Sequence, residues 1–113
     1  MFRIVFIKPG KLYDVLSQYT DPHIVDIRKE GTSEQLKKIY EKDYTPISEL
    51  VNRGLTQVFL RKEATGLMRL HIFIDKCKDF ERELIIVHSD EEQAQYIKNK
   101  LMGEVEEELC LML

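Results

Sequence analysis

The sequence contains few of the residues that interrupt or cross-link a chain. It has five glycines, three prolines and two cysteines in 113 residues. Cys77 and Cys110 lie far apart, without the Cys-x-x-Cys spacing of a zinc site. The three histidines also fall in separate segments, with no metal-binding spacing among them. We therefore expect two free thiols, no disulfide framework, no metal site and no cofactor.

Long apolar runs are missing as well. No stretch approaches the roughly 20 apolar residues that span a bilayer, and the first apolar run, Phe2 to Ile7, is too short for the core of a signal peptide. The chain is 43% hydrophobic and 33% charged, a balance typical of a globular protein. These features predict one globular domain over residues 1–113 that is cytoplasmic and makes no membrane contact.

An excess of positive charge is also lacking, because the formal net charge is −3. A molecule with this charge has no general attraction for polyanions, so nucleic-acid binding would require a local basic patch.

The first half of the chain reads as short alternating elements. An apolar run at 2–7 and a weaker one at 23–28 predict strands, and apolar residues at helical spacing predict a helix over 11–19. Two further helices are expected. One begins at Thr32 as N-cap with Gln35 in the capping-box position, and the other covers 45–54, with Pro46 in its first turn and Gly54 after its end.

In the next segment, residues 56–75, apolar side chains recur at every second position. Residues 56–63 and 67–75 alternate apolar and polar side chains around Ala64-Thr65-Gly66, which predicts a β-hairpin with Gly66 in the turn. This register would place Arg61 opposite Arg69 on one face. The other face would be core, formed by Val58, Leu60, Met68, Leu70, Ile72 and Ile74.

A third strand of this group at 83–88 and a closing helix complete the chain. Ser89 and Glu92 have the spacing of a capping box, and the helix would begin at Asp90. Its end is ambiguous, since Gly103 is a conventional stop while later residues favour helix. The order β-α-β-α-α-β-β-β-α predicts an α/β (mixed α+β) domain, with a mixed five-stranded sheet, a β-hairpin and about four helices.

Two basic clusters are candidate binding sites. If the strands at 2–7 and 83–88 are parallel neighbours, the residues that follow them would meet in one crevice and could bind a phosphate or carboxylate. Those residues are Lys8, Gly10, Lys11, His88 and Ser89. The hairpin would gather a second group, which could stack bases and pair phosphates, or could be covered by a helix. Its members are Gln57, Phe59, Arg61, Arg69, His71 and Phe73.

The last five residues form an unbroken apolar segment. It would pack on the protein's own core or form an interface between subunits, and the interface candidates are Leu109, Leu111, Met112 and Leu113.

No nucleophile with its base, metal set or cofactor loop is visible in the sequence. We therefore expect a small cytoplasmic binding or regulatory module that acts through protein contacts as a homodimer. The alternative is a nucleotide- or nucleic-acid-binding protein that uses one of the two basic clusters and could cleave phosphodiesters. Whether the protein is an enzyme is left open by the sequence.

Overall fold

The computed structural model describes residues 2–28, 33–50, 57–101 and 103–113, and of residues 57–62 it describes the backbone. Strands and α-helices alternate strictly along the chain. The strands are β1 (Arg3–Ile7), β2 (His23–Asp26), β3 (Tyr44–Pro46), β4 (Glu83–Val87) and β5 (Cys110–Met112). The helices are α1 (Leu12–Leu16), α2 (Glu34–Tyr40), α3 (Gln57–Asp79) and α4 (Glu91–Leu101). Short 3-10 turns precede α1, β3, α3 and β5.

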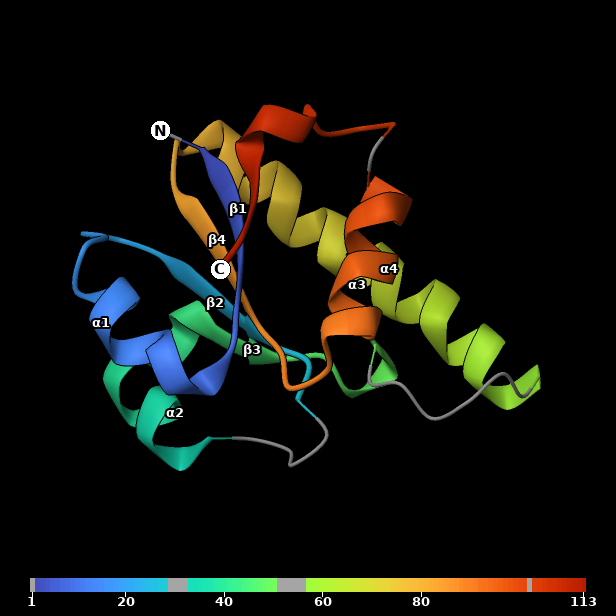
Figure 1. The fold of residues 1–113 in the computed structure, drawn as a ribbon, viewed down its shortest axis with the longest axis horizontal. Coiled ribbons are helices and arrows are strands. Elements are labelled where there is room, and N and C mark those ends of the chain that lie inside the picture. The colour runs from blue at the N-terminus through green and yellow to red at the C-terminus, as the bar shows by residue number, and fades with distance from the viewer. Residues whose placement is uncertain (1, 29–32, 51–56, 102) are drawn as a thin grey trace.

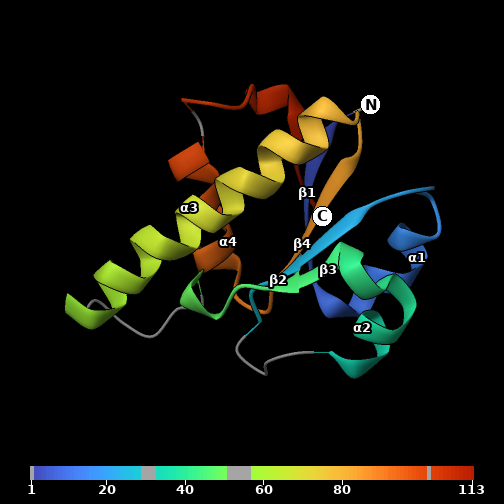
Figure 2. The same cartoon turned by 180° about the vertical axis from the view of Figure 1, so that it is seen from behind.

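All five strands belong to one parallel sheet, in the order β3-β2-β4-β1-β5. Parallel strands need crossover connections, and α-helices supply them here, on both faces of the sheet. Helices α1 and α2 cover one face, while α3 and α4 cover the other (Figures 1 and 2). The α/β class, a five-stranded sheet and four helices are confirmed, whereas the mixed sheet with a hairpin is wrong. The predicted order β-α-β-α-α-β-β-β-α is also wrong, because the predicted strands 56–63 and 67–75 lie in α3, and β3 and β5 were not predicted.

Two of the three inner strands, β1 and β4, explain why the sequence carries apolar residues at consecutive positions. Along β1, Ile4 and Phe6 join the core under α3 and α4, while Val5 and Ile7 join the core under α1 and α2. All four side chains are completely buried. A strand covered on both faces cannot alternate apolar with polar residues, so the expectation of interior strands at 2–7 and 83–88 is met.

The segment that was expected to form the hairpin is helix α3. Its buried side chains include Leu70, Ile74 and Cys77, at the spacing of one helix face. Met68 and Ile72, which the hairpin would have placed in the core, are exposed. Residues 67–75 alternate because the buried Leu70 and Ile74 and the exposed Met68 and Ile72 together fall at every second position.

Gly66 lies inside α3 and packs against another segment, instead of forming a turn. A Cβ at this position would come within 2.8 Å of Leu50 Cγ and 3.0 Å of Glu49 Cβ. The glycine therefore lets α3 approach the 3-10 turn Ser48–Leu50, where Leu50 is fully buried. Arg69 of α3 holds the same turn through two bonds to the Glu49 carboxylate, at 2.9 and 3.0 Å.

The helix expected over 45–54 is also wrong. Tyr44–Pro46 forms the edge strand β3, and Ser48–Leu50 is a 3-10 turn, while Gly54 lies outside the described residues. Thr32, the expected N-cap of the preceding helix, also lies outside the described residues. Ser33 is the N-cap there, and its hydroxyl accepts a bond from the Leu36 amide at 3.3 Å.

Both cysteines are buried and unpaired. Burial raises the pKa of the Cys77 thiol to about 11, and it also raises the pKa of Cys110. Within the described residues, no helix has the length and apolarity that crossing a membrane requires.

The close approach at Gly66 predicts that Gly66→Ala destabilises the protein. Alanine favours helix by about 1 kcal/mol over glycine, but forcing a methyl group against the buried Leu50 costs roughly 1 to 3 kcal/mol. We expect a net loss in the free energy of unfolding, measured by urea denaturation. Gly103→Ala is the matched control, because a Cβ there meets nothing within 4 Å. Equal stability of the two variants would contradict the packing role of Gly66.

Candidate functional site

The first candidate site lies at the carboxyl ends of β1 and β4. These strands are parallel neighbours, with Ile7 level with Val87, so Lys8 and His88 follow them at the same edge. The chain leaves β1 toward α1 on one face and leaves β4 toward α4 on the opposite face. Such divergence at the carboxyl edge of a parallel sheet is where α/β proteins commonly bind ligands. The strand adjacency that this candidate site requires is therefore present.

The chain's own carboxylates already occupy the positions that an anion would take there. Glu91 forms an ion pair with Lys8 at 3.0 Å. Asp90 Oδ1 accepts the amides of Glu92 and Gln93 at 3.0 and 3.2 Å, so it caps α4 in place of the expected Ser89. The Lys11 amide donates to the Lys8 carbonyl at 3.2 Å, and among the described residues no side-chain hydrogen bond or ion pair joins Lys11 or Ser89 to this group. Anion binding at this edge stays a prediction, with Asp90 and Glu91 as competitors.

His88 is the unusual residue of this edge. Its side chain is 1% exposed, and neither ring nitrogen makes a hydrogen bond of ordinary geometry within the described part of the chain. Burial lowers the pKa of His88, and the nearby Lys8 ammonium lowers it further. Asp90 and Glu91 act in the opposite direction without reversing the shift. Burial therefore holds this imidazole neutral.

The second candidate cluster is dispersed, because the hairpin that would have assembled it is a helix. Arg69 binds Glu49, His71 Nδ1 contacts Glu104 Oε2 at 2.9 Å, and Phe73 stacks on His23 at 4.6 Å between ring centroids. The side chains of Gln57, Phe59 and Arg61 lie outside the described residues. The described members thus contact three different parts of the fold. The hairpin that was expected to gather the six residues is wrong, while nucleic-acid binding by them stays a prediction.

The carboxyl-terminal candidate forms an edge of the sheet. Leu109 and Met112 pack against the core under α3 and α4, Leu111 packs against the opposite core, and Leu113 is 43% exposed. The segment Cys110–Met112 pairs with β1 as strand β5. These residues therefore cover their own sheet, and any interface must use the outer side of β5.

The outer side of β5 carries an open backbone donor. Leu113 donates its amide inward to the Phe6 carbonyl at 2.9 Å, and amides alternate in direction along a strand, so the Met112 amide faces outward. The Cys110 amide also faces outward but is bound to the Glu107 carbonyl. Within the described residues, no strand pairs with this side of β5.

The opposite edge of the sheet, at β3, is closed. Ile47 donates inward to the Asp26 carbonyl at 2.9 Å, which turns the amide positions of Tyr44 and Pro46 outward. The Tyr44 amide is bound to the Glu41 carbonyl, and proline has no amide hydrogen. The two edges of the sheet therefore differ in whether another strand can be added to them.

A groove runs beside the open edge. It has a volume of about 550 Å³, and its walls are Glu91, Glu92, Gln95, Tyr96 and Asn99 of α4 together with Met112 of β5. The α4 residues recur three to four positions apart, so they form one exposed stripe of the helix. Periodicity alone could have identified this stripe, but its proximity to the last strand depends on the strand order.

Negative charge gathers at both ends of this edge. Glu92 stands at the start of α4 beside Glu91, which is paired with Lys8, and Glu106, Glu107 and Glu108 precede β5. One positive group is also near, since the Lys100 ammonium lies 5.4 Å from the centroid of the Tyr96 ring. The pKa of Glu108 is raised because the Glu106 carboxylate lies beside it. Two neighbouring carboxylates of this kind favour the approach of a cation.

Among the residues that the structure describes, no three histidine, cysteine, aspartate or glutamate side chains converge to hold a metal ion. Comparison with protein-family models, with curated proteins and with solved structures finds no significant match to this chain. Because no match supplies a function, the chemistry of the site is inferred from the residues of this chain alone.

The buried neutral His88 predicts a loss of stability in acid. Its folded-state pKa lies below the ordinary value of 6.5, so the unfolded chain binds more protons as the pH falls below about 6.5. The free energy of unfolding should then decrease by up to about 1.4 kcal/mol per pH unit for this residue. His23, whose pKa is also lowered, acts in the same direction.

Replacing His88 by leucine should reduce this fall in the free energy of unfolding at acid pH. Stability near pH 8 should stay within about 1 kcal/mol of the wild type, because an apolar side chain there has no unmet hydrogen bonds. Urea denaturation at several pH values measures both quantities. If the variant loses as much stability at acid pH as the wild type does, His88 does not take up a proton on unfolding.

Proposed function

We propose that the protein is a small protein-binding module that takes an extended segment of a partner protein along the outer edge of β5. The observation that carries this proposal is the outward Met112 amide beside the groove. An added strand would bond to the open backbone groups of Met112, and its side chains would contact the stripe of α4. Because β5 has only three residues, most of the selectivity must come from those side-chain contacts.

The charges around the groove favour a basic partner segment. Lysine or arginine side chains on an added strand would meet Glu92 on one wall and the Glu106–Glu108 turn near the start of β5. Opposite charges across such an interface raise the association rate and exclude acidic competitors. Apolar residues between the basic ones would pack against Met112 and Tyr96, of which Tyr96 is 36% exposed.

A second copy of the chain is the other possible occupant, in line with the homodimer expected from the sequence. Self-pairing of β5 would satisfy the Met112 amide and bury Leu113. However, each copy carries three consecutive glutamates next to β5 and would add them to an edge that is already acidic. The charge distribution therefore favours a basic partner over self-association.

A synthetic peptide that alternates lysine with valine over seven residues should bind the protein, as measured by fluorescence anisotropy. Ion pairs at an exposed rim are screened by salt, so the affinity should fall severalfold between 50 and 500 mM sodium chloride, concentrations chosen to span the range over which screening becomes strong. The same peptide with glutamate in place of lysine should not bind. Equal binding of both peptides would contradict the charge argument.

Met112→Pro tests the backbone part of the proposal. Proline removes the outward amide while the inward ladder to β1 remains, so peptide binding should be lost and the fold kept. Met112→Leu is the matched control, because it keeps the amide and an apolar side chain, and it should bind as the wild type does. Light scattering on the same samples reports the mass. A wild-type dimer that Met112→Pro converts to monomer would identify a second copy as the occupant.

A further inference from the structure

A second pocket lies at the opposite end of the sheet, where the strands begin. It has a volume of about 260 Å³ and is lined by His23, Lys42, Asp43, Phe73, Lys76, Cys77 and Arg82. These residues come from the start of β2, the turn before β3, the last turns of α3 and the residue before β4. No sequence motif links them, and the parallel order of β2, β3 and β4 brings them together.

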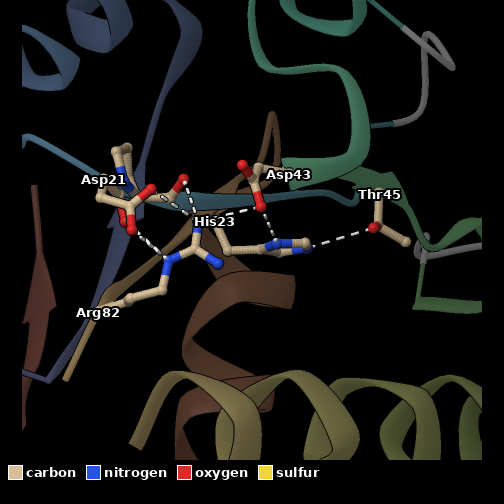
Figure 3. Close-up of polar contacts among 6 residues, drawn as sticks. Asp21, His23, Asp43, Thr45 and Arg82 are labelled. Carbon is tan, nitrogen blue, oxygen red and sulfur yellow. Dashed lines mark hydrogen bonds and ion pairs between the residues drawn. The ribbon is translucent and has the colours of Figure 1, made fainter. Parts of the chain in front are cut away.

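A polar network forms the floor of this pocket (Figure 3). His23 Nε2 lies 3.2 Å from the Thr45 hydroxyl, and Nδ1 lies 3.7 Å from Asp43 Oδ1. Arg82 Nη2 contacts the same Asp43 oxygen at 3.0 Å. Arg82 also binds the Asp21 carbonyl through Nε at 2.9 Å and the Asp21 carboxylate at 3.2 Å. The guanidinium is thereby fixed in position.

Positive groups outnumber negative ones around the cavity itself. Lys42, Lys76 and Arg82 line it, against the single carboxylate of Asp43. Arg82 directs Nε and Nη2 to Asp21, Pro22 and Asp43, and its Nη1 makes no hydrogen bond or ion pair with a described residue. The ammonium groups of Lys42 and Lys76 lie on exposed residues and can turn toward a ligand. The Lys76 ammonium lies 6.0 Å from the centroid of the Phe73 ring. A fixed guanidinium with two exposed ammonium groups suits a compact oxyanion.

His23 adds a proton-dependent charge to this group. The residue is 6% exposed and stacks on Phe73. Its pKa is lowered mainly by burial and then by the Arg82 guanidinium, with a smaller effect of Lys76, while Asp43 raises it. At neutral pH the imidazole is therefore uncharged, and an anion in the pocket would favour its protonated form.

We propose that this pocket binds a small ligand through a phosphate or sulfate group, held by Lys42, Lys76 and Arg82, and that binding is coupled to protonation of His23. The site is separate from the β5 edge and does not depend on the protein-binding proposal. The pocket volume of about 260 Å³ suits a single oxyanion group with a small substituent better than a nucleic-acid strand.

Inorganic sulfate is the first probe, because sulfate does not titrate between pH 5 and 8 while inorganic phosphate does. Isothermal titration calorimetry should show sulfate binding that strengthens as the pH falls from 8 toward 5.5. If the anion raises the pKa of His23 by one unit, the gain in affinity approaches about tenfold. A nuclear magnetic resonance titration should show the His23 ring signals, assigned with His23→Asn, shifting to higher pKa with sulfate.

The double variant Lys42→Ala/Lys76→Ala should weaken sulfate binding roughly tenfold or more, since each charge-assisted contact contributes a large part of such an affinity. Lys37→Ala/Lys38→Ala removes two exposed lysines of α2 outside the pocket and is the matched control, which should bind as the wild type does. Circular dichroism confirms that both variants fold.

Two results would overturn the proposal. One is sulfate affinity that is the same in both double variants, which would show general attraction to lysines. The other is absence of binding with an unchanged His23 titration, which would leave the Asp21, Asp43 and Arg82 network as a purely structural tie between β2 and β4. Replacing sulfate with phosphate and then with a phosphate monoester tells whether the pocket accepts a substituent.

Discussion

The fold depends on the pairing of β1 with β4 at the centre of a parallel sheet. Both strands are fully buried on both faces, with Ile4 to Ile7 and Leu84 to Val87 at 0% exposed. Burying such strands requires helices on each side, and the chain provides α1 and α2 on one and α3 and α4 on the other. Their burial contributes hydrophobic stabilisation of roughly 25 cal/mol for each Å² of apolar surface removed from water.

This arrangement leaves functional chemistry to the margins of the sheet. The centre is apolar, and polar side chains collect where strands begin, where they end and along the two edges. At the carboxyl ends the chain's own carboxylates, Asp90 and Glu91, neutralise the helix terminus and Lys8. At the strand starts a pocket with excess positive charge remains. Of the two edges, Pro46 closes one and Met112 leaves the other open.

The sequence correctly predicted the elements in which the local pattern of apolar residues matches their burial in the fold. The inner strands at 2–7 and 83–88 have apolar residues at consecutive positions, and the closing helix has its apolar residues Ala94, Ile97 and Leu101 on one buried stripe. The stop suggested by Gly103 agrees with a helix that ends at Leu101. In each of these elements, local pattern and tertiary burial favour the same structure.

Other elements could not be predicted because their residues satisfy two patterns at once. Residues 67–75 fit a strand and a helix equally, and contact of Gly66 with Leu50 across the fold favours the helix. Residues 44–46 carry a helix start signal yet form β3, since pairing with β2 satisfies their backbone. The pocket around His23 was missed for a related reason. Its members are distant in sequence, and no spacing rule connects His23, Asp43 and Arg82.

The proposed binding of a partner strand depends most directly on the open Met112 amide of β5, and residue-resolved hydrogen exchange measures whether that amide is open. In dilute protein the amides of Leu111 and Leu113 should exchange slowly, because both point toward β1. The Met112 amide points away from β1 and should exchange near the rate of an unstructured peptide. Addition of the lysine-valine peptide should then protect Met112 selectively. Strong protection of Met112 in the free protein at low concentration, or no change with the peptide, would contradict the proposal that this edge receives a partner strand.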